Sequence, residues 1–192
     1  LGIWLSGAQS RRDCLFRLTA GTLPLGEVRQ LSYPDLIMYP TDRIAVTGPN
    51  GTGKSTLIRH ILANLNVDAD RVAYLPQEVA LDATHRIMDR LSRLSRMQLA
   101  WAMTVVSRLN SRPERLLETA ESSPGEIRKA LLALDIANEP HLIVMDEPTN
   151  HLDLPSIECL EEALEGCPCG LLLVSHDEWF LNKLTQQRWR IV

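Results

Sequence analysis

Nine consecutive residues between positions 48 and 56 have the types and the spacing that bind phosphate. They fit the pattern G-x-x-x-x-G-K-[ST], with an apolar stretch before them and an amphipathic stretch after them. Glycines let successive backbone N–H groups turn inward around phosphate oxygens, and a helix N-terminus adds its positive dipole. Lys54 can reach the β- and γ-phosphates, and the hydroxyl of Ser55 can hold Mg²⁺. The candidate nucleotide-binding residues are Gly48, Pro49, Asn50, Gly51, Thr52, Gly53, Lys54, Ser55 and Thr56.

A pair of acidic residues, Asp146 and Glu147, follows the apolar run 142–145, about 90 residues downstream of the glycine-rich segment. Four apolar residues in a row are typical of a strand that is buried on both faces of a parallel sheet. Ligands of such sheets bind at the carboxyl ends of the strands. Asp146 is therefore a candidate Mg²⁺ ligand, and Glu147 is a candidate to polarise an attacking water molecule.

A family resemblance rests on the residues around this pair, Glu147-Pro148-Thr149-Asn150-His151-Leu152-Asp153. They resemble the segment that follows the Walker B strand in ATP-binding cassette (ABC) proteins. The Thr-Asn-His-Leu-Asp form is similar to that of the ABC-F subfamily, which are soluble twin-cassette ATPases that act on the ribosome. The resemblance extends from about residue 40 to the end of the chain, and more loosely to its start. It implies that the chain binds ATP with Mg²⁺ and that a second cassette is its partner.

The resemblance also assigns roles to two polar residues that follow strand-like runs. Gln77, after the run 72–75, matches the Q-loop glutamine, which contacts Mg²⁺ and the water near the γ-phosphate. His176, after the run 171–174, matches the switch histidine, which contacts the γ-phosphate and positions the catalytic water. The implied catalytic residues are Glu147, His176 and Gln77, and the implied Mg²⁺ ligands are Ser55, Gln77 and Asp146.

Residues 123–126 have two compatible interpretations. Ser123, Pro124, Gly125 and Glu126 resemble the signature motif, which in the family contacts the γ-phosphate of ATP held by the opposite cassette. Pro124 and Glu126 depart from the glycine and glutamine that are usual there. The same residues form a capping box with proline at the first helical position, which would begin this helix in any protein. A capped helix N-terminus is also an anion site, so the two interpretations do not conflict. Asp153 matches the D-loop aspartate at the cassette–cassette interface.

Alternating strand and helix patterns predict the elements that position these motifs. Residues 1–42 have the pattern of a β-rich lobe, with short or edge strands interrupted by prolines. Strands are predicted at 43–47, 72–75, 142–145, 171–174 and 187–192, and helices at 54–65, 126–138, 155–165 and 177–184, with helical structure also over 84–119. We expect an α/β P-loop fold in a single domain, 1–192, with a mostly parallel core sheet. An antiparallel β lobe over 1–42 and a helical subdomain at about 78–125 complete it.

The composition excludes several classes of protein. With 45% hydrophobic and 23% charged residues, the 192-residue chain is globular and not disordered. Its net charge of −4 argues against bulk electrostatic binding of nucleic acid. No apolar run is long enough to cross a membrane, so no membrane insertion is expected. The four cysteines are too sparse for a disulfide scaffold, so we expect thiols in a reducing, cytoplasmic setting. The pair in Cys167-Pro168-Cys169 lacks a second pair that a zinc site would need.

These observations predict one cassette of an ABC-F-type ATPase. The chain opens at Leu1 and not at methionine, so we expect the C-terminal cassette of a longer protein. The expected activity is ATP hydrolysis in concert with a second cassette, slow in the isolated chain. The ribosome is expected as partner on resemblance alone, in a translation or antibiotic-resistance factor. Two alternatives stay open: the ATP-binding subunit of a membrane transporter, and an ATP-sensing module with negligible hydrolysis. For the aromatic residue that stacks on adenine, the candidates are Trp4, Phe16 and Tyr33.

Overall fold

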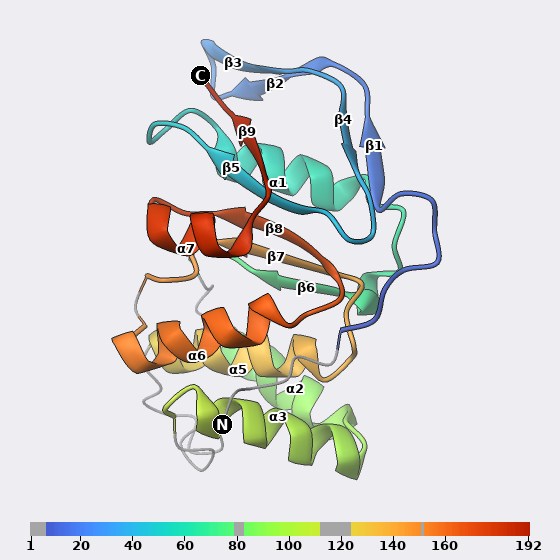
Figure 1. The fold of residues 1–192 in the computed structure, drawn as a ribbon, viewed down its shortest axis with the longest axis vertical. Helices are drawn as coiled ribbons and strands as arrows, with labels where there is room; N and C mark the ends of the chain where they lie inside the picture. The colour runs from blue at the N-terminus through green and yellow to red at the C-terminus, as the bar shows by residue number, and fades with distance from the viewer. Residues whose placement is uncertain (1–6, 79–82, 112–123, 151) are drawn as a thin grey trace.

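A five-stranded parallel sheet forms the centre of the computed structural model, which describes residues 7–78, 83–111, 124–150 and 152–192 (Figure 1). The strands lie in the order β6 (Val72–Leu75), β7 (Leu142–Asp146), β8 (Gly170–Val174), β5 (Arg43–Thr47) and β9 (Gln187–Arg190). Each neighbouring pair is parallel, for example Asp146 beside Val174 and Val46 beside Val174. The carboxyl ends of all five strands therefore meet at one edge. The predicted parallel core sheet is confirmed.

The sheet separates two hydrophobic cores, because successive side chains of a strand point to opposite faces. One face packs against α1 (Lys54–Ala63) and the β lobe through Ile44, Val46, Leu142, Val144, Leu172 and Val174. The other face packs against the remaining helices through Ala45, Ile143, Met145, Leu171 and Leu173. Strands β7 and β8 are buried along their whole length. This explains why their sequences are continuous apolar runs.

The N-terminal lobe is antiparallel, as predicted, and consists of two separate strand pairs within residues 7–42. Strand β1 (Phe16–Leu18) pairs with β4 (Leu36–Met38), and β2 (Gly21–Leu25) pairs with β3 (Arg29–Tyr33). Both pairs lie on the α1 side of the sheet, away from α2 and α3 (Figure 1). Residues 1–6 of the predicted lobe lie outside the described ranges.

Five helices cover the opposite face in the part of the chain that the structure describes. They are α2 (Ala83–Arg93), α3 (Arg96–Arg108), α5 (Pro124–Ile136), α6 (Leu154–Glu165) and α7 (Glu178–Leu184), and a short 3₁₀ turn, η1 (Ala69–Arg71), precedes β6. Helices α2 and α3 both contact α5. The helical pattern at 84–119 corresponds to two helices, because Ser95 and Gln98 form a capping box that begins α3; residues 112–119 are not described. None of the described helices is both long and apolar enough to cross a membrane.

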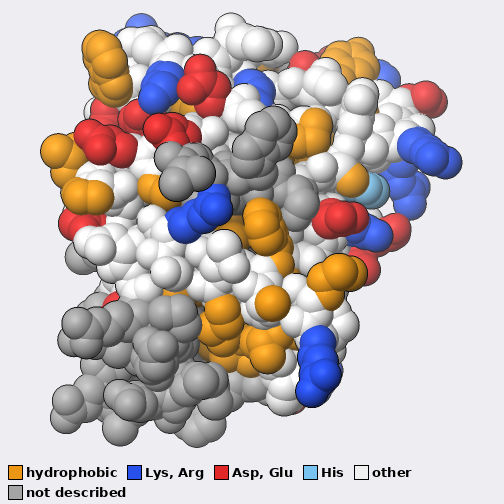
Figure 2. Space-filling view, turned by 60° about the horizontal axis from the view of Figure 1, so that its bottom comes forward, with side chains coloured by type: hydrophobic (Ala, Val, Ile, Leu, Met, Phe, Trp, Pro, Cys, Tyr) orange, Lys and Arg blue, Asp and Glu red, His pale blue; other side chains and the backbone are white. Residues whose placement is uncertain are grey.

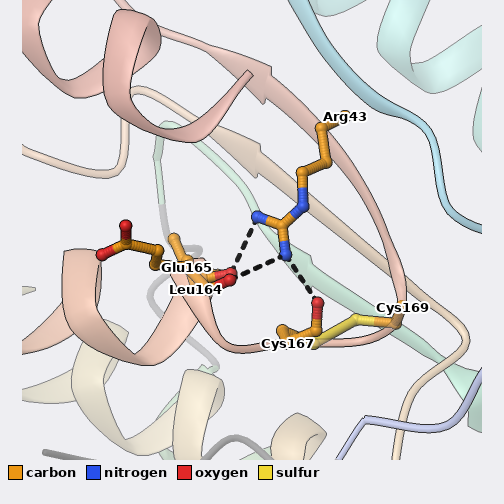
Figure 3. Close-up of a disulfide and its surroundings, with 5 residues drawn as sticks. All are labelled: Arg43, Leu164, Glu165, Cys167 and Cys169. Carbon is orange, nitrogen blue, oxygen red and sulfur yellow. Dashed lines mark hydrogen bonds between the residues drawn. A yellow bond between two sulfur atoms is a disulfide. The ribbon is translucent and has the colours of Figure 1, made fainter. Parts of the chain in front are cut away.

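A disulfide between Cys167 and Cys169 corrects the expectation that these residues are thiols. The chain turns at Pro168 between α6 and β8, which brings the two Cα atoms to 5.6 Å, within the range that a disulfide can bridge. Arg43 lies beside this turn and donates hydrogen bonds to the carbonyls of Leu164, Glu165 and Cys167 (Figure 3). The turn between α6 and β8 is therefore held by one covalent and three polar contacts.

Candidate functional site

One cavity of about 1010 Å³ gathers the candidate residues at the carboxyl edge of the sheet. Each comes from the end of a different strand, since the glycine-rich segment follows β5, Gln77 follows β6, Glu147 follows β7 and His176 follows β8. The predicted site residues that line the cavity are Asn50, Gly51, Gly53, Lys54, Ser55, Thr56, Gln77, Asp146, Glu147 and His176. The topology therefore brings together residues that are up to 126 positions apart, the separation between Asn50 and His176.

The loop between β5 and α1 needs its glycines for backbone reasons. Gly51 and Gly53 have φ of 76° and 98°, in the left-handed region that favours glycine. A Cβ atom on Gly53 would also lie 2.7 Å from Cδ2 of Leu25. The Nζ atom of Lys54, a buried residue, donates to the carbonyls of Gly48 and Pro49, each at 2.9 Å. These contacts hold a positive charge across the loop at the wall of the cavity.

Glu147 is held in an unusual position at the end of β7. Its φ of 51° is rare for a residue with a side chain, and such strain is concentrated at functional sites. Its backbone N–H donates to the carbonyl of Val174 at 2.8 Å. Burial raises the pKa of Glu147, and the charge of Asp146 adds to the rise, whereas His176 and Lys54 oppose it. The carboxyl group is therefore tuned to be a stronger base than an exposed glutamate.

His176 links the acidic pair to the glycine-rich loop. Its Nε2 atom lies 2.8 Å from Oδ1 of Asn50 and 3.3 Å from Oε1 of Glu147. Its backbone N–H donates to Oε2 of Glu147 at 3.3 Å. Because both neighbours of Nε2 are oxygen atoms, this nitrogen is assigned the hydrogen. The imidazole is half-exposed toward the cavity, where a bound group can reach it.

The donor set of the cavity suits a small hard cation. Ser55, Gln77 and Asp146 supply hydroxyl, amide and carboxylate oxygens to the same cavity, and Mg²⁺ prefers oxygen ligands and keeps some of its waters. The residues present therefore fit the predicted Mg²⁺ site. Within the described ranges, no cluster of three or more His, Cys, Asp or Glu side chains is arranged to hold a metal.

The predicted signature residues lie elsewhere in the chain. Helix α5 begins at Pro124, as expected for proline at the first helical position, whereas Ser123 lies outside the described residues. Gly125 and Glu126 are described, and neither lines the cavity. This arrangement is compatible with a role toward another molecule, which stays a prediction.

Asp153, predicted at an interface, makes contacts within its own chain. Its carboxylate accepts hydrogen bonds from Asn110 at 2.6 Å and from Ser156, and it lies 3.4 Å from Nζ of Lys129. These contacts join the end of α3, α5 and the start of α6. The predicted interface role of Asp153 stays a prediction, and the structure adds a second role inside the cassette.

The sequence interpretation missed Arg128 and left the adenine-stacking residue unplaced among three aromatic candidates. Arg128, on α5, is buried and hydrogen-bonds the segments that carry Gln77 and Glu147; an arginine on the apolar face of a predicted helix was the available signal. Phe16 is fully buried against Trp189, and Tyr33 is hydrogen-bonded to His60. Neither aromatic residue lines the cavity, and Trp4 is not among the described residues. The N-terminal lobe instead contributes Pro24, Leu25, Gly26 and Arg29 to the cavity wall.

Comparisons with known proteins show which family the chain belongs to. Residues 31–150 match the family described as "ABC transporter". The chain is 34% identical to ATP-binding protein Uup of Caulobacter vibrioides over 89% of its length, and spans 28% of that protein. It is 33% identical to the zinc import ATP-binding protein ZnuC of Paracoccus denitrificans, over 79% of its length and 65% of that protein. It is also 33% identical to the ribosome protection protein VmlR of Bacillus subtilis, over 87% of its length and 32% of that protein.

Solved structures give the same fold. The ATP-binding subunit of an ABC transporter superposes with a TM-score of 0.70 at 21% identity, covering 92% of this chain and 85% of that one. The family match covers more than half of the chain, and it includes the glycine-rich loop, Gln77 and the acidic pair. This chain therefore belongs to the ABC family of ATP-binding, ATP-hydrolysing domains.

Proposed function

We propose that this chain is one cassette of an ABC-F-type ATPase, which closes on a second cassette when MgATP binds between them and opens after hydrolysis. One observation carries the proposal. The cavity that Lys54 lines also places Nε2 of His176 between Asn50 and Glu147, at 2.8 and 3.3 Å. Phosphate-binding and water-activating groups thus share one site.

Binding of the triphosphate follows from the loop. Backbone N–H groups around Gly51 and Gly53 and the N-terminus of α1 favour phosphate oxygens, and the ammonium group of Lys54 adds a full charge. Mg²⁺, held by Ser55, Gln77 and Asp146, would neutralise charge on the phosphate oxygens. Arg29 and Arg59 also line the cavity and add positive charge near its mouth.

Hydrolysis uses the acidic pair and the histidine. The carboxylate of Glu147 polarises a water molecule for in-line attack on the γ-phosphate, and its raised pKa favours proton acceptance. The imidazole of His176 lines the same space, and its Nε2–H, which lies between Asn50 and Glu147, would turn from them to hold the attacking water or a γ-phosphate oxygen. Gln77 lines the same cavity, where its amide would contact the same water.

A second cassette is proposed because this cavity is open and the two signature residues whose side-chain surroundings the structure describes, Gly125 and Glu126, do not line it. Leu154 and Trp179 are 67% and 76% exposed at the starts of α6 and α7. Leu154 directly follows Asp153, and Trp179 lies two residues after Asp177, which lines the cavity. We propose that the second cassette covers these two exposed apolar side chains. We accordingly propose that residues 1–192 make up one cassette.

An ABC-F role is favoured over a transporter role by the segment Thr149-Asn150-His151-Leu152-Asp153 and by similarity to Uup and VmlR. The name of VmlR supports a ribosome as partner. Similarity to ZnuC supports the alternative, an ATP-binding subunit of a membrane transporter. On the described face seen in Figure 2, acidic and basic side chains are mixed and hydrophobic ones gather near the middle. We therefore place any strong RNA-binding surface outside this face. Membership in the ABC family supports the cytoplasm as the working compartment.

Calorimetric titration of ATP with Mg²⁺ tests the binding site. The Lys54→Ala variant removes the ammonium group that the loop holds, and we expect ATP affinity to fall at least about tenfold. The matched control is Lys183→Ala, on α7, whose side chain pairs with Glu161 at 2.8 Å and does not line the cavity. It should bind ATP like the wild type. Equal affinity in all three proteins, or no binding by the folded wild type, would contradict the proposal.

Co-sedimentation separates the two partners. The full-length protein that contains this chain is mixed with purified ribosomes or with membrane vesicles, with ATP and with ADP. Binding to ribosomes that depends on ATP supports the ABC-F role, whereas recovery with membranes alone supports the transporter role. Fast hydrolysis by a dilute, demonstrably monomeric chain would contradict the need for a second cassette.

A further inference from the structure

Arg128 on α5 is a buried arginine whose guanidinium group contacts only backbone carbonyls in the hydrogen bonds that the structure records for the described residues. Its side chain is among the largest that are fully buried, with 2% of the residue exposed. One terminal nitrogen donates to the carbonyls of Pro76 and Gln77, both at 2.6 Å. The other donates to the carbonyls of Glu147 at 3.0 Å and Asp146 at 3.4 Å.

These four carbonyls belong to two segments that carry the proposed chemistry. One segment ends β6 and bears Gln77, and the other ends β7 and bears Asp146 and Glu147. Strands β6 and β7 are neighbours in the sheet, and their pairing ends at Leu75 and Met145. The guanidinium therefore bridges the two segments directly after the last pair of residues through which the sheet holds them together. Fixing a carbonyl fixes the plane of its peptide, and hence the direction in which the next side chains leave the backbone.

The chemistry of the group suits this task. A planar guanidinium carries donors in a fixed fork, so it can satisfy two pairs of acceptors with one set of angles. Burial lowers the pKa of Arg128, and the nearby charges of Asp146 and Glu147 oppose that change. A guanidinium stays charged in proteins, so a positive charge is buried beside the acidic pair. Arg128 also lies on the helix that begins at Pro124, so a shift of α5 would reach both segments through one side chain.

We propose that Arg128 is a positioning residue for ATP hydrolysis, which holds the Gln77 and Glu147 segments at a fixed separation and connects them to the helix of residues 124–126. This inference rests on the proposed function of the cavity. It assigns Arg128 no contact with ATP, because Arg128 does not line the cavity. Its loss should consequently affect the rate of the chemical step and not the binding of the phosphate tail.

The test compares Arg128→Lys with the wild type in steady-state hydrolysis by the whole chain, with MgATP varied and in excess over the protein. A lysine keeps the charge but has one ammonium group, which cannot span both pairs of carbonyls. We expect kcat to fall about 10- to 100-fold while KM for ATP changes less than about threefold. In calorimetry without Mg²⁺, Arg128→Lys should bind ATP with the same affinity as the wild type. Added Mg²⁺ should raise the ATP affinity of the variant less than that of the wild type.

Arg43→Lys is the matched control, because Arg43 also donates to three carbonyls, those of Leu164, Glu165 and Cys167, at the opposite end of the sheet. It should lower the melting temperature and leave kcat unchanged. If Arg128→Lys keeps the wild-type kcat, or raises KM in proportion to its loss of kcat, the inference is wrong while the proposed function stands. If the folded wild type binds no MgATP, the proposed function and this inference fall together. If Arg128→Lys does not fold, the uncharged Arg128→Gln replaces it in the same comparison, because it leaves no buried charge without partners.

Discussion

Asp153 at the start of α6 should stabilise the folded chain only while its carboxyl group is charged. The contacts with Ser156, Asn110 and Lys129 all favour the carboxylate, and that with Ser156 is the largest cause. Together they lower the pKa of Asp153 from 3.8 to about 2. Because three helices meet at this carboxylate, the change is expected to appear in the free energy of unfolding of the whole cassette.

The magnitude follows from linkage between protonation and folding. A carboxyl pKa lowered from 3.8 to about 2 corresponds to roughly 2.4 kcal/mol at full strength. The side chain is 43% exposed, so screening by solvent reduces the expected contribution to about 1 kcal/mol. The folded pKa lies below the unfolded one, so this stability is complete at pH values above the unfolded pKa. It is lost as pH falls from about 4 toward 2.

Urea denaturation of the wild type and Asp153→Asn between pH 7 and the lowest pH at which both fold measures the effect. The difference in unfolding free energy should be about 1 kcal/mol at pH 7 and shrink as pH falls below 4. Glu158→Gln, at an exposed position on the same helix, should differ from the wild type by less than about 0.5 kcal/mol at every pH. A difference for Asp153→Asn that does not vary with pH would refute the electrostatic origin.

Two further changes test the catalytic base and the turn before β8. Glu147→Gln should lower single-turnover phosphate release by about 10²- to 10⁴-fold and leave ATP affinity within about threefold. Because burial raises the pKa of Glu147, the wild-type rate should decline with falling pH earlier than an ordinary glutamate would allow; a variant with the same pH profile would contradict this role. Reduction of the Cys167–Cys169 disulfide opens a loop with a sequence separation of 2, worth roughly 1.6 kcal/mol by loop entropy. Dithiothreitol should therefore lower the Tm of the wild type by about 3–6 °C without abolishing folding. It should leave the Tm of the Cys169→Ala variant unchanged.

The central strands and the site were predictable because their constraints are local in sequence. A strand buried on both faces must be apolar throughout, so 142–145 and 171–174 reveal their positions, and the residues after them must lie at the carboxyl edge. Helix ends are less determined. Helix α1 ends at Ala63, before the predicted residue 65, because the backbone N–H of Asn64 bonds the carbonyl of Ile61 and its side chain bonds that of His60.

The parts that could not be predicted depend on contacts between distant segments. Arg128 is 52 residues from Pro76 and 19 from Glu147, and no local pattern tells that its donors meet those carbonyls. The Cys167–Cys169 disulfide was not predicted, because the number and spacing of cysteines indicate only disulfide scaffolds and metal sites. This disulfide depends instead on the turn at Pro168, which brings the two cysteines together. For the same reason Phe16 could not be recognised as buried core before the lobe was placed on the sheet.

The two hydrophobic cores on opposite faces of the sheet support different parts of the site. The glycine-rich loop is carried by β5 and by α1, whose apolar side faces the β-lobe core, whereas Arg128 is carried by α5 in the helical core. If Arg128 has the proposed role, substitutions in the helical layer should change the hydrolysis rate and leave phosphate binding, which depends on the other layer, unchanged. In a domain organised in this way, the rate of ATP hydrolysis can change without changes to the residues that bind the nucleotide.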